Sequence, residues 1–218
     1  MNSSDLRRGL VVALSAFLLP VAASAQMKPL AIEIRGGLNW ATGDLKTGIG
    51  AEGQADGLPV TAAEQHGWTG SADLYWTFAK RGAVYIGWNQ AQFDCKDELC
   101  GVSGDIWSAG PEMGFKFSTN SDRSFAPWVR AGLLAHKAKF KEGEVIEENS
   151  TRSPGFEVGV GTDLHIGNRF SIVPAVRFYR YNAGWDLGTP NAARIRKNVG
   201  WVQTDLGLQF HLGGWSPQ

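Results

Sequence analysis

The sequence predicts an all-β protein, an eight-stranded antiparallel up-and-down transmembrane β-barrel preceded by an export signal. Three observations predict this fold class. Apolar and polar residues alternate in eight segments, the connections between these segments alternate between long and short, and no later segment is apolar for long enough to form a spanning helix. A chain that crosses lipid without helices must do so as a closed sheet, because every backbone polar group needs a partner there.

The first 25 residues have the three parts of an export signal. A pair of arginines precedes an apolar run over residues 9–21, and the small residues that end at Ala25 form a cleavage site. The apolar run is shorter than the roughly 20 residues that a spanning helix needs. We therefore predict cleavage before Gln26 and one barrel domain over residues 26–218.

The charge balance limits the partners of this domain. The chain has 21 basic and 21 acidic residues, and the leader holds two of the basic residues and one of the acidic ones, which leaves a formal charge near −1. This balance leaves nothing basic enough to attract nucleic acid over a long range.

The first two segments establish the alternation that a barrel in lipid requires. Residues 30–41 place apolar or small side chains on one face, namely Leu30, Ile32, Ile34, Gly36, Leu38 and Trp40. The other face carries Glu33, Arg35 and Asn39. Residues 67–79 repeat the pattern, so each segment has a predicted lipid face and a predicted inner face.

Four more segments follow the same rule, at residues 83–93, 104–118, 125–140 and 155–166. The seventh covers residues 170–181, although Pro174 lacks one donor of the strand ladder. The eighth covers residues 200–212 and alternates clearly, with Leu206 and Leu208 opposed to Asp205 and Gln209.

The connections also follow a regular order. Long polar connections are predicted at residues 42–66, 94–103, 141–154 and 182–199. Short ones are predicted at residues 80–82, 119–124 and 167–169. Outer-membrane barrels have short periplasmic turns and longer outer loops, so this order predicts that both termini lie on the periplasmic side.

In this architecture the chain resembles the small outer-membrane β-barrel proteins, the group that includes the OmpA transmembrane domain, OmpX and the opacity-type proteins. The most specific resemblance lies in the last segment, which is similar to the signal that barrel-assembly machinery reads on a last strand, at Asp205, Gly207, Phe210 and Leu212. Bacterial versions commonly end on an aromatic residue, whereas here residues 213–218 follow. The resemblance implies a bacterial outer-membrane location, with membrane lipid and the assembly machinery as partners.

The predicted inner faces carry ten charged residues. They are Glu33, Arg35, Asp73, Glu112, Lys116, Arg130, Glu157, Asp163, Arg177 and Asp205. Eight strands leave an interior that side chains can fill, and a buried charge without a partner costs several kcal/mol. We therefore predict a hydrogen-bonded ionic plug, with a narrow gated ion path as the alternative.

Several tryptophans fall on predicted outward faces near strand ends, where amphipathic rings prefer the membrane boundary. They are Trp40, Trp68, Trp76, Trp88 and Trp107. The pattern predicts aromatic girdles. A loop aromatic such as Trp185 is a candidate for stacking against a carbohydrate ligand.

The two cysteines, Cys95 and Cys100, lie in one predicted outer connection. In an exported chain with no other cysteine, this spacing predicts a disulfide. The alternatives are a metal pair or redox-active thiols.

The sequence shows no catalytic grouping. Residues 179–184 faintly resemble a stretch of the outer-membrane lipid A deacylases, but Tyr179 and Tyr181 stand where that family has its catalytic His and Ser. The three histidines of the inner faces, His136, His165 and His211, are not grouped with a serine and an acid. No phosphate loop or metal-ligand cluster is present, so we expect no cofactor and no metal.

These observations predict a non-enzymatic barrel with a structural role, or with a surface-interaction role carried by its long outer loops. One alternative is a narrow pore or small-solute transport barrel of the OmpW kind. A soluble exported barrel of the lipocalin type is a second, and a lipid-modifying outer-membrane enzyme is a third.

Overall fold

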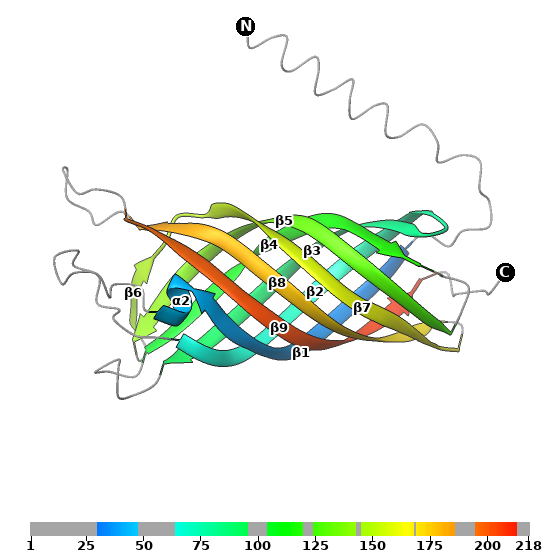
Figure 1. The fold of residues 1–218 in the computed structure, drawn as a ribbon, viewed down its shortest axis with the longest axis horizontal. Helices are drawn as coiled ribbons and strands as arrows, with labels where there is room; N and C mark the ends of the chain where they lie inside the picture. The colour runs from blue at the N-terminus through cyan, green and yellow to red at the C-terminus, as the bar shows by residue number, and fades with distance from the viewer. Residues whose placement is uncertain are drawn as a thin grey trace, which may run out of the picture.

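The chain forms a closed antiparallel β-barrel (Figure 1). The computed structural model describes residues 30–47, 64–95, 104–119, 124–142, 145–167, 169–185 and 195–212. Eight long strands make the barrel, namely β1 (Leu30–Gly43), β2 (Glu64–Ala79), β3 (Gly82–Cys95), β4 (Gly104–Ser118), β5 (Phe125–Glu142), β7 (Ser153–Ile166), β8 (Phe170–Trp185) and β9 (Ile195–His211).

Each long strand pairs with the next long strand in sequence, and the pairing of the first with the last completes the ring. The first strand pairs with the last in a register that runs from Ala31 opposite His211 to Gly43 opposite Val199. Strand β4 pairs with β5, so no long strand is left with an open edge among the described residues. The predicted eight-stranded up-and-down topology is therefore confirmed.

Two short elements were not predicted. A five-residue strand, β6 (Val145–Asn149), pairs with the last residues of β5, inside the interval 141–154 that the sequence indicated as a polar connection. A short helix, α2 (Asp44–Thr47), directly follows β1, inside the predicted connection 42–66. Both elements are too short to give a periodic signal in the sequence. Several long strands also extend beyond their predicted ends, most of all β9, which begins at Ile195.

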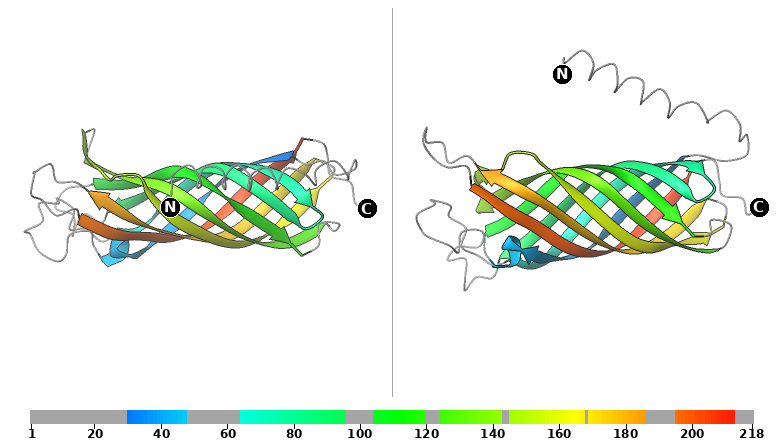
Figure 2. Two further views of the ribbon diagram at one scale, coloured as in Figure 1. Left: turned by 90° about the horizontal axis from the view of Figure 1, so that it is seen from above. Right: turned by 45° about the horizontal axis from the view of Figure 1, so that its top comes forward.

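The two ends of the barrel differ. Helix α2 and strand β6 lie at one end of the barrel (Figures 1 and 2). We call it the loop end, because the longer segments of sequence between consecutive long strands connect strand ends there. The opposite end, which we call the turn end, has the tight connection through Lys80 and Arg81 and the turn at Gly167, whose φ of 66° favours glycine.

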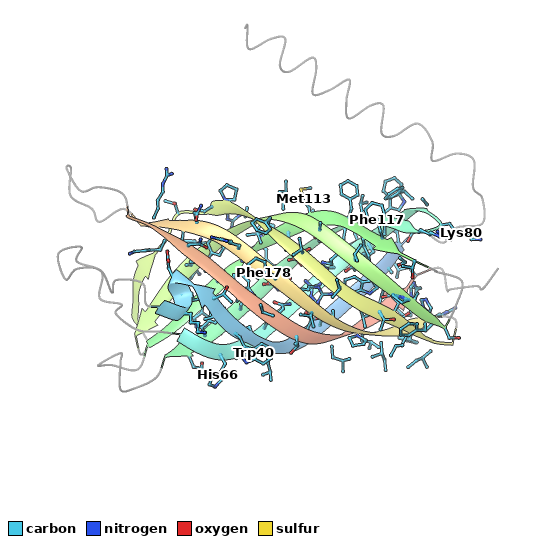
Figure 3. All side chains as sticks on the ribbon, viewed as in Figure 1. Trp40, His66, Lys80, Met113, Phe117 and Phe178 are labelled. Atoms are coloured by element: carbon cyan, nitrogen blue, oxygen red, sulfur yellow. The ribbon has the colours of Figure 1, made fainter. Side chains whose placement is uncertain are left out.

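The distribution of side chains is the reverse of that in a soluble protein. Large apolar side chains are exposed on every long strand, and those of Met113 and Phe117 project from the edge of the barrel in Figure 3. Leu133 on β5 is 67% exposed, whereas its strand neighbour Arg130 is 2% exposed and faces inward. Exposed apolar bands and buried charges are expected of a barrel whose solvent is lipid, so the fold is that of a transmembrane barrel and not of a lipocalin.

Some sequence predictions fall outside the described residues. These are the export signal over residues 1–25, its cleavage before Gln26, the residues after Leu212, and Cys100 with its predicted bond to Cys95. They remain predictions. Within the described part of the chain, no helix is long and apolar enough to cross a membrane.

Candidate functional site

The centre of the barrel interior is an ionic layer built around Arg130. This guanidinium contacts carboxylates from three other strands, with Nε 2.7 Å from Glu157 Oε1, Nη1 2.9 Å from Asp73 Oδ2 and Nη2 3.0 Å from Glu112 Oε1. The strand alternation turns these side chains inward, and the barrel closure brings β2, β4, β5 and β7 within reach of one another. One arginine thus connects strands on different sides of the interior.

A second arginine, Arg35 on β1, completes the centre of this layer. It pairs with Asp73 and Glu112, the same two carboxylates that Arg130 contacts. Its Nη1 also lies 3.7 Å from Glu33 Oε1. Because both cations share both anions, the four side chains form one unit instead of two separate ion pairs.

Two more cationic side chains extend the layer. Arg177 on β8 pairs with Asp205, and its Nη2 lies 3.2 Å from Glu33 Oε1. Lys116 on β4 pairs with Asp163 at 2.7 Å from Nζ to Oδ1. All ten charged residues that the sequence placed on inner faces are buried in the interior, and each contacts at least one of the others.

Aromatic side chains surround the cations. Tyr85 on β3 donates a hydrogen bond to Glu157, and the Arg130 guanidinium carbon lies 4.0 Å from the centre of the Tyr85 ring. Tyr75 donates to Asp73 Oδ2 at 3.1 Å and accepts from Arg130 Nη1 at 2.9 Å. These contacts favour the charged form of the arginine in a water-poor interior, since the ring faces and hydroxyl groups replace part of its hydration.

Two inner glycines make room for Tyr85. Its side chain starts on β3 and reaches Glu157 on β7, so it must pass over β4 and β5. A Cβ at Gly114 would lie 2.6 Å from the Tyr85 hydroxyl, and a Cβ at Gly132 would lie 3.1 Å from Tyr85 Cζ and clash with the hydroxyl. The absence of a side chain at both positions therefore allows the hydrogen bond.

The ionic layer has more acids than bases. Six carboxylates face four cationic side chains among the ten residues, an excess of two. One oxygen each of Glu33, Asp73, Glu112 and Glu157 accepts no hydrogen bond from the described part of the protein. The excess of acids would attract cations rather than anions to the interior.

A second, mainly apolar layer fills the interior toward the loop end. Its buried members come from β1, α2, β3, β4, β5, β8 and β9, and include Leu45 of α2, Phe93, Leu134, Tyr181 and Trp201. Tyr179 stacks on Trp201 with ring centres 4.8 Å apart and an angle of 5° between the planes. This layer includes Leu45 of α2, and buried polar side chains such as Asn39, Thr69 and Gln203 share the interior with it.

The three inner histidines lie in two separate parts of the interior. His136 lies in the apolar layer, where its Nδ1 is 3.0 Å from Ser108 Oγ, and that hydroxyl is 2.9 Å from the Tyr181 hydroxyl. Its Nε2 has no hydrogen-bond partner in the described part of the chain. Near the turn end, Ser171 Oγ lies 2.7 Å from His165 Nδ1 and 2.9 Å from His211 Nε2.

Sequence reasoning identified the charges of the interior but missed most of its apolar layer. The sequence does not indicate Phe93, Leu134 or Leu45 as interior residues. An apolar side chain that faces the inside of a barrel gives the same pattern as an irregular strand or a loop. The four residues of the assembly signal lie as the alternation predicts, with Asp205 and Gly207 inward and Phe210 and Leu212 outward. The described residues include no group of three or more His, Cys, Asp or Glu side chains that could hold a metal ion.

The fold and the charged interior together define a small transmembrane β-barrel whose centre is filled by side chains. Several solved structures share this fold, including the following two. Neisserial surface protein A is similar with a TM-score of 0.57 at 12% identity, over 84% of this chain and 97% of that one. The outer-membrane protein OprG from Pseudomonas aeruginosa is similar with a TM-score of 0.51 at 18% identity, over 83% of this chain and 96% of that one.

The chain thus has the fold of the small eight-stranded outer-membrane β-barrels. At these identities the likeness concerns the fold alone. No protein-family model matches the chain, and no curated protein matches its sequence.

Proposed function

We propose that this chain is a non-enzymatic integral protein of the bacterial outer membrane, with a closed interior and a structural or surface-interaction role through its loop end. The observation that carries the proposal is the ionic layer. Arg130 and Arg35 connect carboxylates from several strands across the interior, and an apolar cluster lies toward the loop end. These contacts between strands support a closed interior.

The arrangement of possible catalytic groups supports a non-enzymatic role. Ser108 and His136 resemble a nucleophile and base, but both are fully buried among aromatic rings. No carboxylate among the described residues hydrogen-bonds His136, so the pair lacks the third group that orients a catalytic base.

A second candidate function is a narrow cation path. The excess of two carboxylates in the ionic layer, with four of their oxygens lacking a hydrogen bond from the described protein, favours it. Such a path would require Tyr85 or Arg130 to move, because both lie across the centre.

Conductance in planar bilayers tests the proposal. The purified full-length chain should give no large steady conductance. If the ionic layer is the barrier, removing a member such as Arg130 or Glu157 should raise the conductance or loosen the fold, since an unpaired charge must recruit water or change protonation. Small cation-selective steps in the wild type would favour the narrow path, and porin-like conductance would refute the closed interior.

A further inference from the structure

The outward face of the barrel is divided into two sectors near the loop end. One sector carries outward basic side chains from neighbouring strands. They are Lys137 and Lys139 of β5, Arg152 just before β7, Arg180 of β8 and Arg196 of β9. We call these five residues the basic sector. The pairings β5–β7, β7–β8 and β8–β9 make their strands neighbours, so the charges lie along one side of the barrel.

On the other side of the barrel, tryptophans lie at the edge of the lipid face that is nearest the loop end. Each of the strands β1 to β4 contributes one at this level, namely Trp40, Trp68, Trp88 and Trp107 (Trp40 is labelled in Figure 3). The rings of Trp68 and Trp107 lie edge to face with centres 5.5 Å apart. No described outward side chain of β1 to β4 is basic apart from His66. This side therefore has an aromatic boundary, and the described residues of β1 to β4 place no outward arginine or lysine beside it.

The positive charges of the basic sector have no described carboxylate beside them. No carboxylate among the described side chains points outward on β5, β7, β8 or β9, and none forms an ion pair with the five residues. Arg180 Nε donates to Asn198 Oδ1 at 3.0 Å, which fixes the guanidinium on the outer surface. The guanidinium carbon of Arg152 lies 6.0 Å from the Trp88 ring centre, where the two sectors meet.

The basic sector lies at the edge of exposed apolar surface. Phe156 lies directly opposite Arg180 in the β7–β8 pairing, and Leu133 and Phe178 are the nearest large apolar residues facing outward on β5 and β8. A ligand that meets both surfaces must combine a negatively charged head with an apolar body. A lipid in the leaflet at the loop end has this form.

We propose that the basic sector binds the phosphate groups of a phosphorylated lipid headgroup in the leaflet that surrounds the loop end. Arginine and lysine hydrogen-bond phosphate oxygens with the aid of charge, and arginine can do so through two nitrogens. The exposed apolar residues below the sector pack against the acyl chains. The inference rests on the proposed membrane orientation but not on the closed interior.

Lipid binding by the purified full-length chain in a neutral detergent tests the proposal. The probe is diphosphorylated lipid A, compared with the same lipid after its phosphates are removed and with inorganic phosphate. The wild type should bind the phosphorylated lipid more tightly than either comparison. The triple variant Lys137→Gln, Arg152→Gln, Arg180→Gln should bind it on the order of 100-fold more weakly, given about fivefold for each basic residue near a charged lipid surface.

A matched control removes three basic residues at the turn end, with Lys80→Gln, Arg81→Gln and Arg169→Gln. This control should bind as the wild type does. Arg152→Lys keeps the charge and should retain most of the binding, which separates loss of charge from misfolding.

Three results would overturn the proposal: equal binding of the phosphorylated and dephosphorylated lipids, equal losses in the two triple variants, or inorganic phosphate bound as tightly as the lipid. The last would indicate a site for free anions. Bilayer conductance is measured separately, so a pore-forming wild type would refute the closed interior without affecting this test.

Discussion

At the scale of single residues, Arg130 is the centre of the ionic layer. It contacts three carboxylates, and two of these are shared with Arg35. The inner face of β5 could be assigned from the alternation alone, but the partners could not. A strand pattern gives the direction of a side chain, whereas barrel curvature decides which opposing side chains it meets.

We predict that Arg130→Met strongly destabilises the barrel. The substitution leaves Glu157, Asp73 and Glu112 with less cationic compensation, and breaking a buried ion pair by removing one partner costs about 3–5 kcal/mol. Urea unfolding in lipid vesicles measures the effect. Lys137→Met, an outward change of the same kind, is the control and should shift the midpoint little; equal shifts would contradict the central role of Arg130.

The inner glycines give a second residue-scale prediction. Gly132→Ala should destabilise the barrel by about 1–3 kcal/mol, because the new methyl group meets both the Tyr85 side chain and the Met113 carbonyl oxygen and overpacking costs this much. Gly36→Ala is the matched control, since a Cβ there meets only the Thr69 carbonyl oxygen at 3.7 Å. The unfolding midpoints of the two variants are compared. If Gly132→Ala does not lower the midpoint, the Tyr85 side chain does not need the space at Gly132.

At the scale of elements, each strand separates a lipid face from an inner face. Val160 on β7 is 56% exposed and Leu206 on β9 is 59% exposed, both in the apolar band. Thr77 lies close to the turn end of β2. Val160 and Leu206 therefore face lipid, whereas Thr77 lies on the inward-facing side of β2, next to a register irregularity between Thr77 and Ala79.

We predict that Leu206→Arg or Val160→Arg impairs insertion far more than Thr77→Arg. A charged side chain at the bilayer midplane costs roughly 2–4 kcal/mol, and the cost falls toward the interface. Folding yields into vesicles measure the difference. Equal yields for the three variants would contradict the assigned lipid face.

The connection between β3 and β4 gives a prediction from sequence alone. Cys95 and Cys100 should be joined, and the bond should be dispensable for folding because the strand ladder supplies most of the stability. Closing so short a loop contributes roughly 2 kcal/mol. Mass spectrometry of unreduced protein should show the loss of two hydrogens, and two free thiols in freshly exported protein would disprove the bond.

At the scale of the whole molecule, the pairing of β1 with β9 closes the sheet and removes its edges. Closure links residues from the two ends of the described chain, so the barrel should unfold as a unit. We predict that the unheated protein resists detergent and migrates differently on a gel from a boiled sample. Identical migration would contradict a stable closed barrel.

The sequence by itself determined the strand count, the topology, the facing of each long strand and the ten inner charges, because alternation and turn spacing are local properties of the chain. Only the tertiary structure decided that Arg35 and Arg130 share Asp73 and Glu112, that Tyr85 crosses two strands to Glu157, and that Leu45 of α2 joins an apolar layer. It also placed the basic residues of four neighbouring strands along one side of the barrel. These arrangements depend on barrel closure and strand stagger, which bring together residues far apart in sequence.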